Sequence, residues 1–223
     1  MEKQLTILIT CYNKEKYISY ILGQLIDQNC AEIDVHIVDD GSTDNSINII
    51  KELVEPIDNF HIHHWDKNQG TGYTRQYCLS LVQTNYFIFI DSDDMLVENY
   101  VELILSKIKE NPNADIHHFR TRYYPLGNTV VFSFSLWDRV ISKKFLDKNN
   151  ITFNDKLTNM EDWNLRCRIE QVPFEEVQHQ EVLYIYNILA EGTITHDKPI
   201  WYNHNLDGIR AESAADYCED YNK

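Results

Sequence analysis

The sequence lacks a long apolar run, an internal repeat and a low-complexity segment, and each absence excludes a class of protein. Nowhere in its 223 residues does an apolar stretch approach the roughly 20 residues that span a bilayer. Residues 1–4 lead directly into a strand-like run and do not resemble a signal peptide. We therefore expect a soluble, cytoplasmic protein whose contact with membranes is at most transient.

Cysteine and positive charge are also scarce. The 5 cysteines are scattered, odd in number and include no Cys-x-x-Cys pair, which disfavours structural zinc and a disulfide framework and favours a reducing compartment. The chain has 20 Lys and Arg against 35 Asp and Glu, a formal net charge of −15. Such an acidic chain disfavours non-specific binding to nucleic acid or anionic lipid.

The first half of the sequence alternates β-branched runs with amphipathic stretches. This alternation is typical of βαβ units around a parallel sheet and predicts an α/β fold. The expected strands are residues 5–10, 33–38, 60–65 and 86–90, and the expected helices are residues 16–28, 45–54, 73–82 and 98–109. Residues 86–90 (YFIFI) are almost wholly apolar, which predicts a central position in the sheet.

The pattern changes after residue 112. The expected strands there are residues 115–124, 129–135 and 182–187, and the expected helices are residues 140–148 and 162–170. No clear linker interrupts the sequence. We expect one structural domain over residues 1–223, with halves at 1–112 and 113–198 and a polar, acidic tail at 199–223.

Polar clusters follow three of the expected strands. They are residues 10–13 (TCYN), Asp39-Asp40 and residues 91–94 (DSDD). In an open parallel sheet, ligands bind outside the carboxyl ends of the strands. We therefore expect the three clusters to converge on one crevice.

The Asp91-Ser92-Asp93-Asp94 cluster has the clearest chemical signal. Its carboxylates repel one another unless a cation lies between them. Hard divalent ions such as Mg²⁺ or Mn²⁺ prefer carboxylate oxygens and commonly bridge to a diphosphate. Asp91 and Asp93 project to the same side if the strand continues, so both can reach one ion. The alternative interpretation is a solvated turn with a helix cap.

Other polar residues give weaker signals. Gly70-Thr71-Gly72 belongs to neither phosphate-binding glycine pattern, so by itself it indicates only a loop. Arg75, one helical turn further on, could reach a phosphate. His61 and His63 share one face of a strand, and we interpret them as surface or strand packing instead of metal ligands.

Four stretches, taken together, resemble family 2 glycosyltransferases of the GT-A fold. They are residues 10–18 (TCYNKEKYI), 38–46 (VDDGSTDNS), 68–76 (NQGTGYTRQ) and 90–94 (IDSDD). Met160-Glu161-Asp162-Trp163 resembles the Glu-Asp motif of the same family. The resemblance implies a Rossmann-like nucleotide-sugar-binding half with a mostly parallel sheet, at residues 1–112, and a smaller acceptor-binding half at residues 113–198.

The resemblance also implies roles for residues of the first half. Thr10 and Tyr12 would line the nucleotide pocket. Asp40, with Asp39 nearby, would recognise the base, which is typically uracil. The residues expected to complete the donor site from the other matching stretches are Asn68, Gly70, Arg75, Asp91 and Ser92.

Metal and catalytic roles follow from the same resemblance. Asp93 would be the metal ligand and Asp91 would face the ribose or a metal-bound water, with Asp94 as a rival ligand. His196 is the nearest candidate for a late histidine that completes the metal site. Asp162 would be the general base of an inverting transfer. Two acids that merely open a helix are the alternative interpretation.

The predicted function is metal-dependent transfer of a sugar from a nucleotide-diphosphate donor, with UDP-sugars favoured and Mn²⁺ or Mg²⁺ as cofactor. The acceptor is a hydroxyl group on a glycan, a lipid-linked sugar, a protein or a modified nucleic acid. A non-catalytic sugar-nucleotide-binding module and a sugar nucleotidyltransferase are the alternatives. A nucleotidyltransferase usually has a glycine-rich loop after its first strand, and here that loop is Cys11-Tyr12-Asn13-Lys14.

Overall fold

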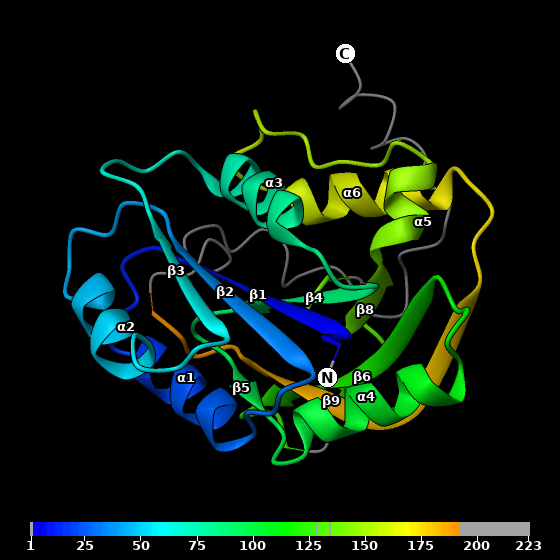
Figure 1. Cartoon of the computed structure of the whole chain (residues 1–223), viewed down its shortest axis with the longest axis horizontal. Helices are drawn as coiled ribbons and strands as arrows, with labels where there is room; N and C mark the ends of the chain where they lie inside the picture. Colours follow the sequence, from blue (N-terminus) through cyan, green and yellow to red (C-terminus); the bar gives the residue numbers. More distant parts are fainter. Residues whose placement is uncertain (1, 128, 134, 192–223) are drawn as a thin grey trace.

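The computed structural model of the chain describes residues 2–127, 129–133 and 135–191 (Figure 1). Within them the chain forms six helices and a nine-stranded sheet. The strands are β1 (Leu5–Cys11), β2 (Ile33–Asp39), β3 (Phe60–His64), β4 (Tyr86–Asp91), β5 (Met95–Leu96), β6 (Ile116–Tyr124), β7 (Val130–Val131), β8 (Arg139–Ser142) and β9 (Glu176–Asn187). The helices are α1 (Ile18–Asp27), α2 (Ser46–Val54), α3 (Thr71–Leu81), α4 (Tyr100–Glu110), α5 (Lys143–Lys148) and α6 (Glu161–Glu170).

The sheet has two parts that differ in strand direction. Its order is β3-β2-β1-β4-β8-β6-β9-β5, with β7 paired to β6. Strands β3, β2, β1 and β4 are all parallel. Strand β8 runs antiparallel to both of its neighbours, so β6 and β9 run in the direction of β4. The expected α/β fold and the central place of residues 86–90 are therefore confirmed.

Alternating side chains divide the core between the two faces of the sheet. Leu5, Ile7 and Ile9 of β1 pack in one cluster with α1, α2 and α4, whereas Leu8 points to the opposite cluster. That second cluster includes residues of α3, α5 and α6. Figure 1 shows these two groups of helices on opposite sides of the sheet. Because β1 and β4 are covered on both faces, they read as continuous apolar runs.

The later strands differ from the expected ones. Among the described residues of the expected strand 129–135, only Val130–Val131 forms a strand, β7, that pairs with β6. The expected helix 140–148 is wrong in its first part, because Arg139–Ser142 forms β8 between β4 and β6. The helix begins only after Ser142, whose hydroxyl oxygen accepts a hydrogen bond from the Phe145 amide. Strand β9 begins at Glu176, six residues before the expected start, because pairing with β6 orders a polar segment.

Two further expectations concern cysteines and membranes. Cys11, Cys30 and Cys78 carry free thiols. Cys167 is disulfide-bonded. Among the residues that the structure describes, no helix has the length and apolarity needed to cross a membrane.

Candidate functional site

The polar clusters of the first half meet at the carboxyl ends of adjacent strands. In the parallel pairing, Cys11 lies beside Asp39 and Thr10 lies beside Asp91. Asp39 in turn pairs with His64, the last residue of β3. The expected convergence at one edge of the sheet is thus present in the structure, and Thr10 lies half-buried at its centre.

The loops after β1 and β2 are joined by reciprocal hydrogen bonds. The Asn13 amide donates to the Ser42 hydroxyl oxygen at 2.9 Å, and the Thr43 amide donates to the Asn13 side chain at 2.7 Å. The Glu15 amide donates to Asp44 at 3.0 Å. These contacts explain why the two motifs occur together, since each loop satisfies the backbone of the other.

Asp39 and Asp40 both hold neighbouring loops in place. Asp39 is fully buried and accepts hydrogen bonds from the Ser42 amide at 3.1 Å and from the His64 ring at 2.9 Å. Asp40 accepts from the backbone amides of Gln69 and Gly70, at 2.7 and 3.0 Å. Burial raises the pKa of Asp40 above its usual value. Both carboxylates expected at the nucleobase therefore also tie this edge of the sheet together.

A glycine permits the close approach of the loop after β3. Gly41 has φ 72°, a left-handed conformation, and a Cβ there would lie 2.5 Å from the Lys67 carbonyl carbon. On the outer side of this loop a hollow of about 380 Å³ is lined by residues 64–67 and Gln69. Asn68 is exposed on the same loop, and Tyr12 is 44% exposed. These two expected donor-site residues are therefore exposed to solvent.

The three acids after β4 have different partners. Asp94 accepts hydrogen bonds from the Tyr184 hydroxyl at 2.8 Å and from the Asn187 amide at 2.7 Å, so both of its oxygens are used by β9. Asp93 forms an ion pair with the Lys14 ammonium at 2.7 Å. These contacts make Asp94 a fold-stabilising residue, whereas Asp91 and Asp93 form ion pairs with Arg75 and Lys14 respectively.

Arg75 lies buried between two carboxylates from distant parts of the chain. Its guanidinium is 3.0 Å from Asp91 and 3.2 Å from Glu161, and it lies over the Phe89 ring at 5.5 Å. Burial alone would lower the pKa of Arg75, but Glu161, Asp91 and Asp162 raise it. Arg75, which we expected at a phosphate, therefore links β4 to the start of α6.

Asp162 follows Glu161 in the first turn of α6. Glu161 is buried and also accepts from the Thr71 hydroxyl at 3.2 Å, whereas Asp162 is partly exposed. Burial is the main reason why the pKa of Asp91 is raised to about 6. Arg75 lowers this pKa, whereas the nearby carboxylates of Asp93 and Asp162 raise it further. Asp162 thus lies within electrostatic reach of the acids that follow β4, on the less buried side of the Arg75 network.

The charge balance of this region suits a divalent cation. Four carboxylates (Asp91, Asp93, Glu161 and Asp162) stand against the two cations Arg75 and Lys14, which leaves two negative charges. Mg²⁺ and Mn²⁺ prefer carboxylate oxygens as ligands, and their positive charge would neutralise this excess. Asp91 and Asp93 fit the role of ligands. His196, the other expected ligand, lies outside the described residues.

Ser92 and Cys11 pack together beneath the crevice. Ser92 is 3% exposed and hydrogen-bonds the Cys11 thiol. Burial, with a smaller contribution from Asp39, raises the pKa of Cys11 to about 12. The thiol therefore stays protonated at neutral pH, and Cys11 is excluded as a nucleophile.

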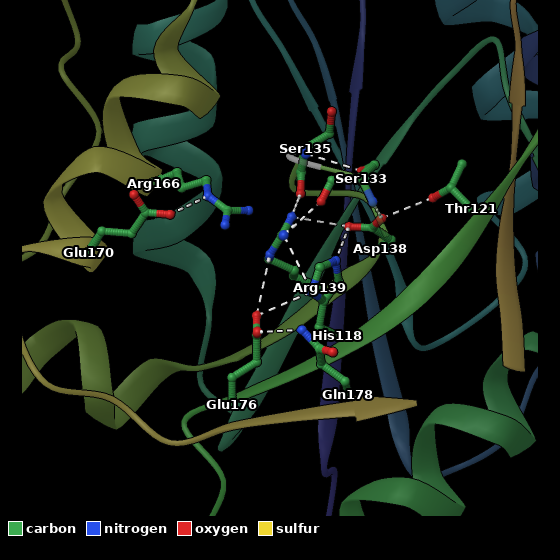
Figure 2. Close-up of polar contacts among 10 residues, drawn as sticks. All are labelled: His118, Thr121, Ser133, Ser135, Asp138, Arg139, Arg166, Glu170, Glu176 and Gln178. Atoms are coloured by element: carbon green, nitrogen blue, oxygen red, sulfur yellow. Dashed lines mark hydrogen bonds and ion pairs between the residues drawn. The ribbon is translucent and has the colours of Figure 1, made fainter. Parts of the chain in front are cut away.

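A second polar cluster lies away from the crevice, where β6, β8 and β9 meet (Figure 2). Asp138 is fully buried and accepts from the Thr121 hydroxyl at 3.0 Å and the Ser133 amide at 2.9 Å. Arg139 donates to Asp138 at 3.2 Å and faces Glu176 at 3.8 Å. Since each charged group has several partners, this cluster holds the antiparallel strands together.

Several residues of the site were missed in the sequence. Lys14 follows the end of β1 and His64 is the last residue of β3, so their position at a carboxyl end was a usable signal. Tyr184 and Asn187 reach Asp94 across 90 and 93 residues of chain. No local pattern indicates such distant partners.

The protein has an α/β fold in which the expected donor-site residues gather at the carboxyl ends of parallel strands. The sequence profile described as "Glycosyl transferase family 2" matches residues 6–170. The chain therefore belongs to glycosyl transferase family 2.

Curated relatives agree with this family. The chain is 31% identical over 182 residues to the teichoic acid poly(glycerol phosphate) polymerase of Staphylococcus epidermidis. This alignment covers 72% of this chain and 25% of that protein. The chain is 35% identical over 116 residues to glycosyltransferase GlyA of Streptococcus pneumoniae, covering 52% of this chain and 16% of that protein. The chain thus spans a quarter or less of the length of these two relatives.

Solved structures show the same fold. The structure of S. aureus TarS in complex with UDP-GlcNAc superposes on this chain with a TM-score of 0.77 at 21% sequence identity. The match covers 87% of this chain and 61% of the TarS chain. The mannosyltransferase PcManGT of Pyrobaculum calidifontis, in complex with GDP-Man and Mn²⁺, matches 86% of this chain and 59% of its own with a TM-score of 0.68 at 13% identity. The expected GT-A fold is confirmed.

Proposed function

We propose that this chain transfers a sugar from a UDP-sugar to an acceptor hydroxyl with inversion, with Asp162 as the general base. Residues 1–112 bind the donor, and residues 113–198 bind the acceptor and supply the base. Donor binding is supported by the polar residues that gather at the ends of β1, β2 and β4, and by the UDP-GlcNAc that accompanies the related TarS structure.

The buried Arg75 is the observation that carries this proposal. It bonds both Asp91, at the end of β4, and Glu161, the residue before Asp162. One side chain therefore fixes the start of α6 relative to the donor edge of the sheet. A general base must be held near the group whose proton it removes, and a buried ion pair provides such positioning.

The proposed reaction is a single displacement. Asp162 accepts the proton of the acceptor hydroxyl while the hydroxyl oxygen bonds to the anomeric carbon of the donor. The bond from that carbon to the diphosphate oxygen breaks on the opposite face, which inverts the configuration. Asp91 and Asp93 would hold a Mn²⁺ or Mg²⁺ ion, which would offset the negative charge that develops on the leaving diphosphate.

Release of UDP from a UDP-sugar tests the proposal. UDP-GlcNAc and UDP-glucose would be incubated with the protein and glycan or polyol-phosphate acceptors, and UDP release and product configuration would be followed. We expect Asp162→Asn to lower turnover about 10²–10⁴-fold while UDP still binds. The matched control is Asp58→Asn, which removes the same charge from an exposed position outside the crevice.

Three outcomes would contradict the proposal. Normal turnover of Asp162→Asn would show that another group is the base. UDP binding without any sugar transfer would identify a binding module. Cleavage of a UDP-sugar by added pyrophosphate to UTP and a sugar 1-phosphate, with no glycoside product, would identify a nucleotidyltransferase.

A further inference from the structure

A cluster of histidines and one aspartate lies on the edge of the sheet, apart from the crevice. Asp34 and His36 are on β2, and His61 and His63 are on the edge strand β3. Asp34 is near the start of β2 and Asp39 is at its end. Five residues of strand separate them by about 16 Å, so this cluster is distinct from the donor site.

The potential ligand atoms of three of these residues lie close together. One ligand atom each of Asp34, His36 and His61 lies within 4.8 Å of the other two. The His61 Nε2 atom is 2.8 Å from Asp34, and the His36 Nε2 atom is 3.4 Å from the other carboxylate oxygen. Ligand atoms around a tetrahedral zinc ion are about 3.4 Å apart, so small side-chain movements suffice for coordination.

A chain of hydrogen bonds orients the His36 ring through its Nδ1 atom. The Nδ1 atom of His36 is 3.1 Å from the Nε2 atom of His63, and the Nδ1 atom of His63 is 3.1 Å from the Tyr77 hydroxyl. When His63 donates to Tyr77, its Nε2 accepts the proton of His36 Nδ1, which leaves a lone pair on His36 Nε2. Histidines that bind metals commonly have their second ring nitrogen fixed in this way.

The other ring nitrogen of His36, Nε2, lacks a hydrogen bond. This atom is buried, and its 3.4 Å contact with the Asp34 carboxylate does not have the geometry of a hydrogen bond. It faces the Asp34 carboxylate, so in the tautomer just described a lone pair opposes a negative charge. A cation placed between them removes this repulsion. The Lys3 ammonium, an ion-pair partner of Asp34, partly fulfils this role.

We propose that Asp34, His36 and His61 bind a transition-metal ion of the zinc type, with water as the fourth ligand. Two imidazoles and one carboxylate favour zinc over magnesium or calcium, which take oxygen ligands. The side chain of His61 is 40% exposed, so the ion has a path from solvent and room for the water. The ion clamps the edge strand β3 to β2.

Titration with Zn²⁺ tests this site directly. The chelator-treated protein would be titrated calorimetrically in excess Mg²⁺, which occupies the carboxylates of the donor crevice. We expect one Zn²⁺ per chain in the wild type. In His36→Gln and in His61→Gln the affinity for Zn²⁺ should fall at least about tenfold. The matched control is His179→Gln, because His179 pairs with His117 at 3.1 Å as His63 pairs with His36.

Two further variants separate a metal site from a simple ion-pair cluster. Lys3→Met removes the competing ammonium and should strengthen Zn²⁺ binding. His63→Gln removes a positioning residue and should weaken Zn²⁺ binding about tenfold without changing the stoichiometry. Zn²⁺ should also raise the melting temperature of the wild type and of His179→Gln, but not of His61→Gln.

Absence of Zn²⁺ binding in the wild type would overturn the proposal. So would wild-type affinity in His61→Gln, whose exposed ring makes misfolding of that variant less of a concern than for His36→Gln. A circular dichroism spectrum like that of the wild type would be required of each variant before its titration is interpreted.

Discussion

Two regions of the sheet stabilise their polar residues in different ways. One is the parallel region (β1–β4); the other, called the antiparallel region because β7 and β8 run antiparallel to β6, contains β6–β9. In the parallel region, loops that follow neighbouring strands bond one another, as Asn13 does with Ser42 and Thr43. In the antiparallel region, buried charges such as Asp138 and Arg139 bond side chains and backbone from several strands. The first arrangement gathers carboxylates at the carboxyl ends of the strands, and the second pairs the carboxylates of Asp138 and Glu176 with Arg139.

The two regions meet at the acids after β4. Asp94 is bound by Tyr184 and Asn187 of β9, and Asp91 is bound by Arg75, which also holds Glu161. The donor edge of the parallel region is therefore shaped by residues of the other region. This dependence shows why a fragment ending near residue 112 would lack a fully formed site.

The largest stability effect is expected where the two regions join. Arg75→Met leaves Asp91 and Glu161 buried without their cation, which should lower the free energy of unfolding by about 3–5 kcal/mol. The matched control is Lys109→Ala, which breaks a more exposed pair with Glu32 and should cost less than about 1 kcal/mol. Urea unfolding of both variants measures the difference, and equal effects would contradict the proposed importance of the Arg75 junction.

A smaller effect is expected at the bond between β9 and the acids. The Tyr184 hydroxyl donates to Asp94 and accepts from the Asp91 amide at 3.1 Å. Tyr184→Phe removes both bonds and should lower the free energy of unfolding by about 1–3 kcal/mol. Because Asp91 and Asp93 then lose part of their support, metal-dependent UDP binding should weaken as well. Unchanged UDP binding in this variant would mean that β9 does not shape the donor edge.

The elements of the parallel region followed from the sequence, because their signals are local. Each buried strand is a short apolar run, and each polar cluster directly follows its strand. The antiparallel region gave no such signal. The apolar residues Val140 and Ile141 were assigned to a helix, and the polar start of β9 is ordered only by pairing with β6.

The positions of the site residues were likewise easier to predict than their partners. A carboxyl-end position identified Asp39, Asp40 and Asp91, and the structure places all three at one edge of the sheet. The ion pair of Arg75 with Glu161 joins residues that lie 86 positions apart in the sequence. Such a contact depends on the packing of α3 against the segment before α6, which no local pattern encodes.

The smallest effect is expected from a charge confined to the antiparallel region. Burial alone would raise the pKa of Glu176 from 4.5, but His118 and Arg139 lower it to about 2. Because the folded pKa lies below the unfolded one, the stabilisation is fully present above pH 4.5 and is lost as the pH falls towards about 2.

Glu176→Gln tests this pH dependence. The difference in unfolding free energy between wild type and variant should be constant from pH 6 to pH 5 and should shrink as the pH falls to about 3. UDP binding should not change, because Glu176 is remote from the crevice. A difference that grows on acidification would contradict the assigned ion pairs.

Calorimetric titration with UDP, with and without Mn²⁺, tests the central claim most directly. We predict that the wild type binds UDP tightly only with Mn²⁺, that Asp93→Asn loses this metal-dependent binding, and that Asp162→Asn retains it. Equal UDP binding by wild type and Asp93→Asn in Mn²⁺, or no UDP binding by either, would contradict a metal-dependent UDP-sugar site at the ends of β1, β2 and β4.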